Sequence, residues 1–449
     1  MLKYDNRRDI LKPFEENREY MDMRVKTGIE QYRKGYGSIR LLDGEGRPVK
    51  GARLELKQKT HDFLHGANIF MLDEMETPEK NEGYKQMFAE SFNLATVPFY
   101  WRDLEPEQGK PRYARDSYKI YRRPAPQLCV DFCKANGITP KAHCLNYDPW
   151  APDWVRGAVP AQEIKRLLDK RFGECAEWFA KDIPGWEVTN ETMCNNGSAT
   201  SFYMEDDFVR WSFDCAERHF PMNELIINEA TDHVWGNSGD YFKVNRNKYL
   251  EQCRLEIEHG APIDAIGMQY HMFFRAEDEL AKASYFYNPV TLYQVMDSYA
   301  KLGKPLQITE VTIPAYSWEA EDEEIQAEIL KNLYAIWFSH PAMEAIIYWN
   351  LVDGYAAFAP QGDMASGENY YAGGLVRFDM TKKPAYYALR DLFTKTWHTE
   401  TVTGTNDEGV AAFNGFFGKY DLEITVDGKT IRRDIHFAKD GVRNLVVRL

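Results

Sequence analysis

The sequence predicts an α/β protein, a closed (β/α)8 barrel of the TIM type joined to a small β-sandwich-like accessory unit. Eight short apolar runs alternate with amphipathic helical segments along the middle of the chain, the pattern of repeated βα units and a parallel sheet. The 449 residues exceed one ordinary domain but suit a barrel of roughly 250 to 350 residues with one smaller unit. Polar residues also follow most of the apolar runs, and a barrel brings such positions together at one end.

The two ends of the chain carry the elements predicted for the accessory unit. Residues 1–36 predict a charged amphipathic helix, which contains MDMRVKTGIEQYRKG and ends at the glycines of GYG. Residues 37–60 predict a β-hairpin, because two alternating strands flank the turn sequence DGEGRP. Residues 399–449 again show short alternating strands, with VDGK and KDGV turns. We therefore expect both ends to meet beside a barrel that spans residues 61–398.

The barrel strands are predicted from short apolar runs with few charges. They are residues 63–70, 93–99, 140–147, 185–191, 224–230, 265–271, 305–311 and 345–353. Longer amphipathic segments between and after them predict helices at residues 162–182, 247–260, 291–303, 324–340 and 383–397. Eight strands with intervening helices predict closure, with the chemistry at the carboxyl ends of the strands.

Polar side chains gather at six successive strand ends. They are His143, Asn146, Asn190, Glu191, Asn228, Glu229, Gln269, His271, Glu310, Trp349, Asn350 and Asp353. Any one of them is readily explained as a hydrogen-bonded structural group. Burying so many without partners would be costly, however, so their joint placement indicates a water-filled site.

Two glutamates in this set, Glu191 and Glu310, match the needs of glycosidic cleavage. The reaction uses one protonated carboxyl to assist the leaving oxygen and one carboxylate to attack the anomeric carbon. We expect Glu191 to be the acid/base and Glu310 the nucleophile, about 5 to 5.5 Å apart as in retaining enzymes. The charge of Glu310 and partial burial are expected to raise the pKa of Glu191. Asn190 is placed to bind the sugar 2-hydroxyl, and His271 to orient Glu310.

Several segments resemble glycoside hydrolase family 10, the barrel-type endo-β-1,4-xylanases. WEVTNET is similar to the acid/base motif of that family and QITEVTIP to its nucleophile motif. YWRDLEPEQGKPRY, AHCLNYDPWAPDWV, IGMQYH and GGLVRFDMTKKPAYYAL resemble further family segments in the right order, from about Phe63 to Trp397. The resemblance implies double displacement on a xylan-type backbone, without metal or cofactor. It implies a substrate-binding set of His143, Asn190, Gln269, His271 and Trp349, to which we add Trp101, Asn146, Tyr147, Asp148 and Tyr270.

The sequence departs from the family pattern on the glycone side. Family members place a Glu-Asn pair and a Lys before the second-strand Trp, where this chain has Val97 to Tyr100 before Trp101. A Trp-His pair on the third strand is replaced by Tyr147 and Asp148, and the second Trp expected after Trp349 is not in register. We therefore expect intact catalysis with a rebuilt glycone pocket, so that a decorated xylan or another β-linked glycan is an open alternative. Phe99 and Tyr100 suit barrel packing equally well.

Two other functions are compatible with the sequence. One is a β-glycosidase of the same clan that acts on a different or decorated glycan. The other is a catalytically silent carbohydrate-binding barrel, against which the retention of both glutamates argues. A lyase or aldolase would need a Schiff-base lysine or a metal cluster at the strand ends. Lys141 begins a predicted strand and is expected to face the other end of the barrel.

The net charge and the cysteines limit which binding partners and metal sites are expected. A net charge of −14 argues against nucleic acid and anionic membranes and favours a neutral or cationic substrate. No apolar run of about 18 residues and no signal peptide are recognisable, which predicts a cytoplasmic protein or a secreted one whose leader was removed. The seven cysteines are dispersed, and Cys129 and Cys133 lack a second pair at ligand spacing, so buried free thiols are expected rather than a metal site. The oligomeric state is left open.

Overall fold

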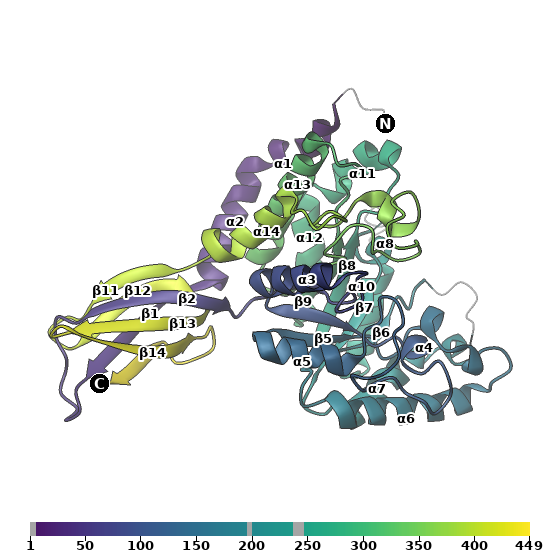
Figure 1. The fold of residues 1–449 in the computed structure, drawn as a ribbon, viewed down its shortest axis with the longest axis horizontal. Helices are drawn as coiled ribbons and strands as arrows, with labels where there is room; N and C mark the ends of the chain where they lie inside the picture. The colour runs from purple at the N-terminus through teal and green to yellow at the C-terminus, as the bar shows by residue number, and fades with distance from the viewer. Residues whose placement is uncertain (1–5, 195–199, 237–246) are drawn as a thin grey trace.

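The computed structural model describes residues 6–194, 200–236 and 247–449. It has two parts, a barrel surrounded by helices and a β-sandwich that extends to one side of it (Figure 1). The described part of the chain begins at the helices beside the barrel and ends in the sandwich, where residues 34–42 pair with two C-terminal strands. The predicted fold class is confirmed.

The barrel is closed by eight parallel strands in the order β10-β3-β4-β5-β6-β7-β8-β9. Strand β10 pairs with both β9 and β3, which completes the ring. All seven residues of β9 are buried, as expected for a parallel strand that is covered on both faces. The strands are β3 (Leu64–Asn68), β4 (Leu94–Pro98), β5 (Thr139–His143), β6 (Gly185–Asn190), β7 (Glu224–Glu229), β8 (Ala265–His271), β9 (Leu306–Thr312) and β10 (Met343–Tyr348).

Helices cover the outside of the barrel. They are α3 (Pro78–Ser91), α4 (Trp101–Leu104), α5 (Pro126–Asn136), α6 (Ala161–Phe179), α7 (Phe208–His219), α8 (Thr231–Trp235), α10 (Lys248–Glu258), α11 (Glu279–Phe286), α12 (Pro289–Ala300), α13 (Ala320–Ser339) and α14 (Pro384–Asp391). Among the described residues, no helix is both long and apolar enough to cross a membrane.

The predicted N-terminal helix is divided into three pieces. A 3-10 turn (Arg7–Leu11) precedes α1 (Lys12–Glu16) and α2 (Arg18–Tyr32). The break between α1 and α2 falls at Asn17, whose backbone is not helical and whose side chain donates to the Pro13 carbonyl. After α2, the Arg33 guanidinium donates to the carbonyl oxygens of Phe338, His340 and Met343, which fixes the start of the sandwich to the barrel.

The accessory unit consists of two facing sheets, with strand orders β12-β1-β15 and β11-β2-β13-β14. Alternate residues of their strands, such as Ile39, Leu54 and Leu422, are fully buried in a core of their own. The strands are β1 (Lys34–Leu42), β2 (Arg53–His61), β11 (Glu400–Gly404), β12 (Val410–Phe416), β13 (Gly418–Val426), β14 (Lys429–Phe437) and β15 (Asn444–Arg448). The predicted sandwich of N- and C-terminal strands is confirmed.

The predicted hairpin within residues 37–60 is wrong in its pairing. Strands β1 and β2 lie in different sheets, and they approach each other only around the turn, through one bridge between Leu42 and Pro48. Beyond the turn, β1 pairs with β12 and β15, while β2 pairs with β11 and β13. Alternation reports which face of a strand is buried but not which strand lies beside it, so both arrangements fit the same pattern.

The cysteines are all free, and six of them are buried as expected. Cys194 is the exception, because it is exposed in the loop after β6.

Candidate active site

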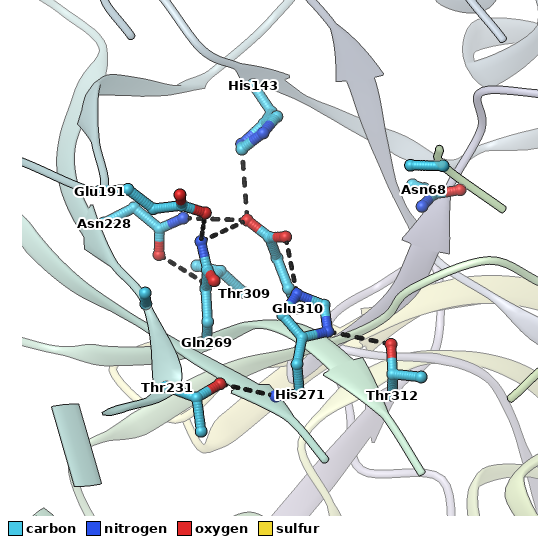
Figure 2. A network of polar contacts seen from close by, with 12 residues as sticks. Asn68, His143, Glu191, Asn228, Thr231, Gln269, His271, Thr309, Glu310 and Thr312 are labelled. Atoms are coloured by element: carbon cyan, nitrogen blue, oxygen red, sulfur yellow. Dashed lines mark hydrogen bonds and ion pairs between the residues drawn. The ribbon is translucent and has the colours of Figure 1, made fainter. Parts of the chain in front are cut away.

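Glu191 and Glu310 lie together at the carboxyl end of the barrel. Glu191 follows β6 directly, and Glu310 lies within β9. Both line a cavity of about 570 Å³ at the mouth of the barrel. The Gln269 amide nitrogen, from β8, lies 3.0 Å from Glu191 Oε1 and 3.1 Å from Glu310 Oε1 (Figure 2). Because one nitrogen reaches both oxygens, the two oxygens can be no more than about 6 Å apart.

The Glu310 carboxylate is held on both oxygens. Asn228 donates to Oε1 at 3.1 Å beside Gln269, and His271 Nε2 lies 3.1 Å from Oε2. These groups are themselves fixed, since Thr309 donates to the Asn228 amide oxygen at 2.6 Å and Thr312 contacts His271 Nδ1 at 2.9 Å (Figure 2). The carboxylate therefore has a single orientation, set by neighbouring strands.

The Glu191 side chain is positioned by an unusual backbone conformation. Its φ of +49° lies in the left-handed region, which costs a non-glycine residue on the order of 1 kcal/mol. The Glu191 N–H donates to the Asn228 carbonyl at 3.1 Å, which holds the turn. Tyr147 donates its hydroxyl to Glu191 Oε2 at 2.5 Å. The chain thus leaves the strand abruptly and aims this carboxyl into the cavity.

A charged network lies inside the barrel beneath the two glutamates. The Glu187 carboxylate contacts the Lys141 ammonium through one oxygen and His143 Nδ1 through the other. Burial would raise the pKa of Glu187, but the charges of Lys141 and His143 outweigh it and lower that pKa to about 2. Burial lowers the pKa of His143, yet Glu187 and Glu310 reverse this effect, so the net shift is upward. His143 Nδ1 also lies 3.8 Å from Glu310 Oε1.

The expectation that Lys141 would face the other end of the barrel is wrong. Its side chain is buried in the barrel interior, where it forms an ion pair with Glu187. Glu187 itself was missed, although it belongs to the motif WEVTNET. A useful signal was present, because opposite charges in two adjacent apolar strands need each other as partners.

The pKa of Glu310 is raised mainly by burial of its carboxyl group. Burial raises the pKa of Glu310 to about 8, with added contributions from the charges of Glu187 and Glu191 and an opposing one from His143. Near neutral pH the pair of carboxyls therefore retains a proton.

Six of the predicted substrate-binding residues line the cavity. They are His143, Tyr147, Asn190, Gln269, His271 and Trp349. We call the cluster His143, Glu187, Asn228, Gln269, His271 and Glu310 the polar floor of the cavity.

The other four predicted residues do not line the cavity. Tyr270 lies between Gln269 and His271 on β8, so alternation turns it outward, where it packs against Trp235 and Trp337. The other three turn into the surrounding structure. The Trp101 indole donates to Glu105 at 2.9 Å, the Asn146 amide to Ser212 at 2.9 Å, and Asp148 accepts from Thr200 at 3.2 Å.

One side of the cavity is formed by aromatic rings and two arginines. We call the group Phe70, Tyr100, Arg122, Arg123 and Trp150 the aromatic wall. The Tyr100 and Trp150 rings are 5.0 Å apart, and the Arg123 guanidinium lies 4.2 Å from the Tyr100 ring. Tyr100 thus faces the cavity, whereas its neighbour Phe99 packs into the barrel against Trp186 at 5.0 Å.

The two arginines were also missed by sequence reasoning. They lie in the segment of residues 99–125 that joins β4 to α5. Connections of this length at the carboxyl end of a barrel commonly carry function, which was a signal for the segment though not for individual residues.

Three groups of described side chains have potential metal-ligand atoms within 4.8 Å of one another. In the group His143, Glu187 and Glu310, the Lys141 ammonium already contacts the Glu187 carboxylate and would repel a cation. In the group Cys194, Glu229 and His233, the Glu229 carboxylate accepts from two backbone N–H groups, and burial raises its pKa to about 7. The third group, Asp169, Cys215 and His219, lies on the outer helices α6 and α7.

Comparison with known proteins agrees with this geometry. The sequence model of glycosyl hydrolase family 10 matches residues 65–392. The chain belongs to glycosyl hydrolase family 10. The match runs from β3 to the end of α14, so it includes both glutamates and leaves the accessory unit outside.

The proteins that resemble this chain have different names. Anti-sigma-I factor RsgI6 of Acetivibrio thermocellus is 24% identical over 409 residues, covering 89% of this chain and 46% of that protein. Endo-1,4-beta-xylanase 1 of Arabidopsis thaliana is 22% identical over 406 residues, covering 89% of this chain and 37% of that protein. The chain thus spans less than half of either relative. The crystal structure of xylanase 10B from Thermotoga petrophila RKU-1 in complex with xylobiose matches with a TM-score of 0.57 at 22% identity, covering 75% of this chain and 95% of that one.

Proposed function

We propose that this family 10 protein is a retaining glycoside hydrolase that cleaves β-linked polysaccharide or oligosaccharide, with a xylan-type backbone as its default substrate. Glu310 is the nucleophile and Glu191 the acid/base. The proposal rests chiefly on the Gln269 amide, which lies within 3.1 Å of an oxygen of each glutamate. The resulting limit of about 6 Å between those oxygens suits the roughly 5 to 5.5 Å of retaining enzymes better than the roughly 6.5 to 9.5 Å of inverting ones.

In the first step, Glu310 attacks the anomeric carbon while Glu191 donates its proton to the departing oxygen. The C–O bond to the leaving group breaks as the bond to Glu310 forms, which gives a covalent glycosyl–enzyme ester. In the second step, Glu191 takes a proton from water, and the resulting nucleophile displaces Glu310 from the sugar.

The polar floor supports the charge changes at Glu310. The nucleophile must be ionised before attack and again after the ester is cleaved. His143 Nδ1 lies 3.8 Å from Glu310 Oε1, and the charge of protonated His143 lowers the pKa of Glu310, which favours the ionised form at both stages. Hydrogen bonds from Asn228 and Gln269 keep the carboxylate aimed at one position, which lowers the entropic cost of attack.

The choice of substrate class follows from family membership and from the cavity. The match to the family that includes endo-1,4-beta-xylanases supports a β-linked backbone, and the related xylanase 10B structure contains xylobiose. Aromatic rings such as Tyr100, Trp150 and Trp349 offer flat apolar faces to the sugar rings.

The test is hydrolysis of a panel of β-linked oligosaccharides, with the products separated by length. We expect turnover of at least one β-1,4-linked xylo-oligosaccharide. No cleavage of xylo-oligosaccharides together with turnover of another β-linked glycan would support the alternative of a β-glycosidase with a different specificity. Product lengths also distinguish internal cleavage from attack at chain ends.

A second candidate function is a carbohydrate-binding barrel without turnover. It is favoured by one observation, the similarity to a protein named as an anti-sigma factor. The two functions separate cleanly, because a binding protein would take up oligosaccharide in calorimetry and release no product from any member of the panel.

A further inference from the structure

Arg122 is a buried cation whose charge has no counterion in direct contact. Its side chain lines the cavity although the residue is only 5% exposed. One terminal nitrogen donates to the Asn350 amide oxygen at 2.8 Å, whereas the buried Nε has no hydrogen-bond partner. In residues 6–194, 200–236 and 247–449, no carboxylate oxygen lies within 4.0 Å of this guanidinium.

The neighbouring Arg123 provides the contrast. Its Nε forms an ion pair with Asp103 at 2.7 Å, so its charge is compensated within the fold. Burial, together with the charge of Arg123, lowers the pKa of Arg122. The negative charge of Glu368 raises the pKa of Arg122. Its carboxylate is linked to Arg122 only indirectly, through the Asn350 amide, which donates to Glu368 at 3.3 Å. An unpaired buried charge costs several kcal/mol, which the fold must offset elsewhere.

The backbone at Arg122 is strained as well. Its φ of +61° lies in the left-handed region, which an arginine adopts at a cost on the order of 1 kcal/mol. Strained backbone conformations are concentrated at active sites and ligand sites, where the surrounding structure holds them in place.

Arg122 lies across the barrel mouth from the proposed acid/base. Its partner Asn350 follows β10 and also contacts Asn68, at the end of β3, at 3.4 Å. In the closed ring β10 and β6 are four positions apart, so Asn350 and Glu191 lie on opposite sides of the mouth. Figure 2 shows Asn68 and Glu191 on either side of Glu310. Since Glu191 protonates the leaving group, Arg122 lies on the side of the sugar that stays attached to Glu310.

We propose that Arg122 binds the carboxylate of a uronosyl unit on the glycone side of the substrate. A carboxylate supplies two coplanar oxygens that match the fork of a guanidinium, and it supplies the missing negative charge. A neutral sugar hydroxyl could accept a hydrogen bond from the guanidinium but would leave its charge uncompensated. The overall charge of −14 governs long-range attraction, whereas Arg122 acts at contact distance inside the cavity. This inference rests on the proposed hydrolase and specifies its substrate.

The test compares one xylo-oligosaccharide that carries a glucuronosyl branch with the same compound after reduction of its carboxyl group to a primary alcohol. Binding is measured by calorimetry on the Glu310→Gln variant, so that cleavage does not interfere. We expect the acidic compound to bind about tenfold more tightly or better, the usual range for a charge-assisted hydrogen-bonded pair. Equal affinity for the two compounds would overturn the proposal without any substitution at Arg122.

Variants then test whether Arg122 causes the preference for the acidic compound. Adding Arg122→Gln to this background should bring the affinity ratio close to one, and Arg122→Lys should leave an intermediate ratio. The matched control is Arg102→Gln, because the Arg102 guanidinium lies 4.0 Å from the Trp150 ring but does not line the cavity. An unchanged ratio in Arg122→Gln, or an equal loss in Arg102→Gln, would show that Arg122 does not bind the carboxylate.

A failure of the proposed carboxylate subsite can be distinguished from a failure of the proposed hydrolase function. Carboxylate-dependent binding without cleavage of any glycan would contradict the hydrolase and support the subsite. Cleavage of neutral xylo-oligosaccharides with no preference for the acidic compound would contradict the subsite alone.

Discussion

The polar floor and the aromatic wall of the cavity differ in whether their polar groups have partners within the protein. In the floor, the Glu310 oxygens and the Glu187 oxygens are each contacted by donors or cations from neighbouring strands. In the wall, the Arg122 guanidinium lies 5.8 Å from the Phe70 ring, and its Nε is left without a partner. A site that must hold one carboxylate in place is complete without ligand, whereas a site that must select a ligand leaves a contact open. The comparison indicates that the floor governs the chemistry and the wall the choice of substrate.

The largest effect is expected from Glu310→Gln in the floor. Removing the nucleophile should lower kcat about 10⁴-fold or more, while oligosaccharide affinity changes little because the amide occupies the same space. Steady-state rates and calorimetry on the same protein measure both quantities. A variant with wild-type turnover would remove Glu310 from the mechanism.

The buried ion pair of the floor is expected to dominate its stability. Lys141→Met would leave Glu187 buried with His143 as its remaining charged contact, and loss of one partner of such a pair costs about 3 to 5 kcal/mol. Urea unfolding would measure the change. The control is Lys134→Met, which removes a solvent-exposed pair with Asp182 and should cost about 1 kcal/mol or less. Similar small losses in both variants would contradict the network.

The pH dependence of stability tests the charge at Glu310. Its folded pKa of about 8 lies above the ordinary value of 4.5, so the folded protein binds more protons than the unfolded chain between these values. The contribution of Glu310 to stability is therefore greatest below pH 4.5 and falls as the pH rises toward 8. Glu310→Gln removes this penalty and should be more stable than the wild type at pH 8, by on the order of 3 kcal/mol. Thermal unfolding of both proteins from pH 5 to 8 should show a widening gap, and a constant gap would be inconsistent with a raised pKa.

The smallest effect is expected in the wall. Trp150→Ala removes a ring that stacks near Tyr100 and Arg123, so it should weaken oligosaccharide binding about tenfold and leave kcat nearly unchanged. Trp178→Ala, on the outer face of α6 and 47% exposed, is the matched control. A larger loss in kcat than in affinity would place Trp150 with the floor rather than with the wall.

The sequence predicted the floor better than the wall for a physical reason. Strand residues such as Gln269 and His271 alternate with outward residues such as Tyr270, so a short apolar run with polar alternates shows which side chains meet inside a barrel. By the same alternation Tyr270 lies outside the cavity against Trp337, contrary to its prediction as a substrate-binding residue. Loop residues such as Arg122 follow no period, and their position depends on contacts with distant strands such as the one to Asn350.

Prediction of the fold from the sequence was limited in the same way. Apolar periodicity predicted every barrel strand and the sandwich, because burial of one or both faces is a local property of a strand. The partners of β1 and β2 were mistaken because pairing depends on segments far away in the sequence, such as β15, which lies just over 400 residues from β1. The Lys141 and Glu187 pair was missed for a related reason, since each residue appears anomalous alone and is explained only by the neighbouring strand.

The most direct test of the central claim is the anomeric configuration of the first product. Proton NMR during the first minutes of cleavage of a β-linked oligosaccharide reports the new reducing end before it equilibrates. Double displacement by Glu310 and Glu191 predicts that the β-anomer appears first. Initial appearance of the α-anomer would mean a single displacement by water and would contradict the account.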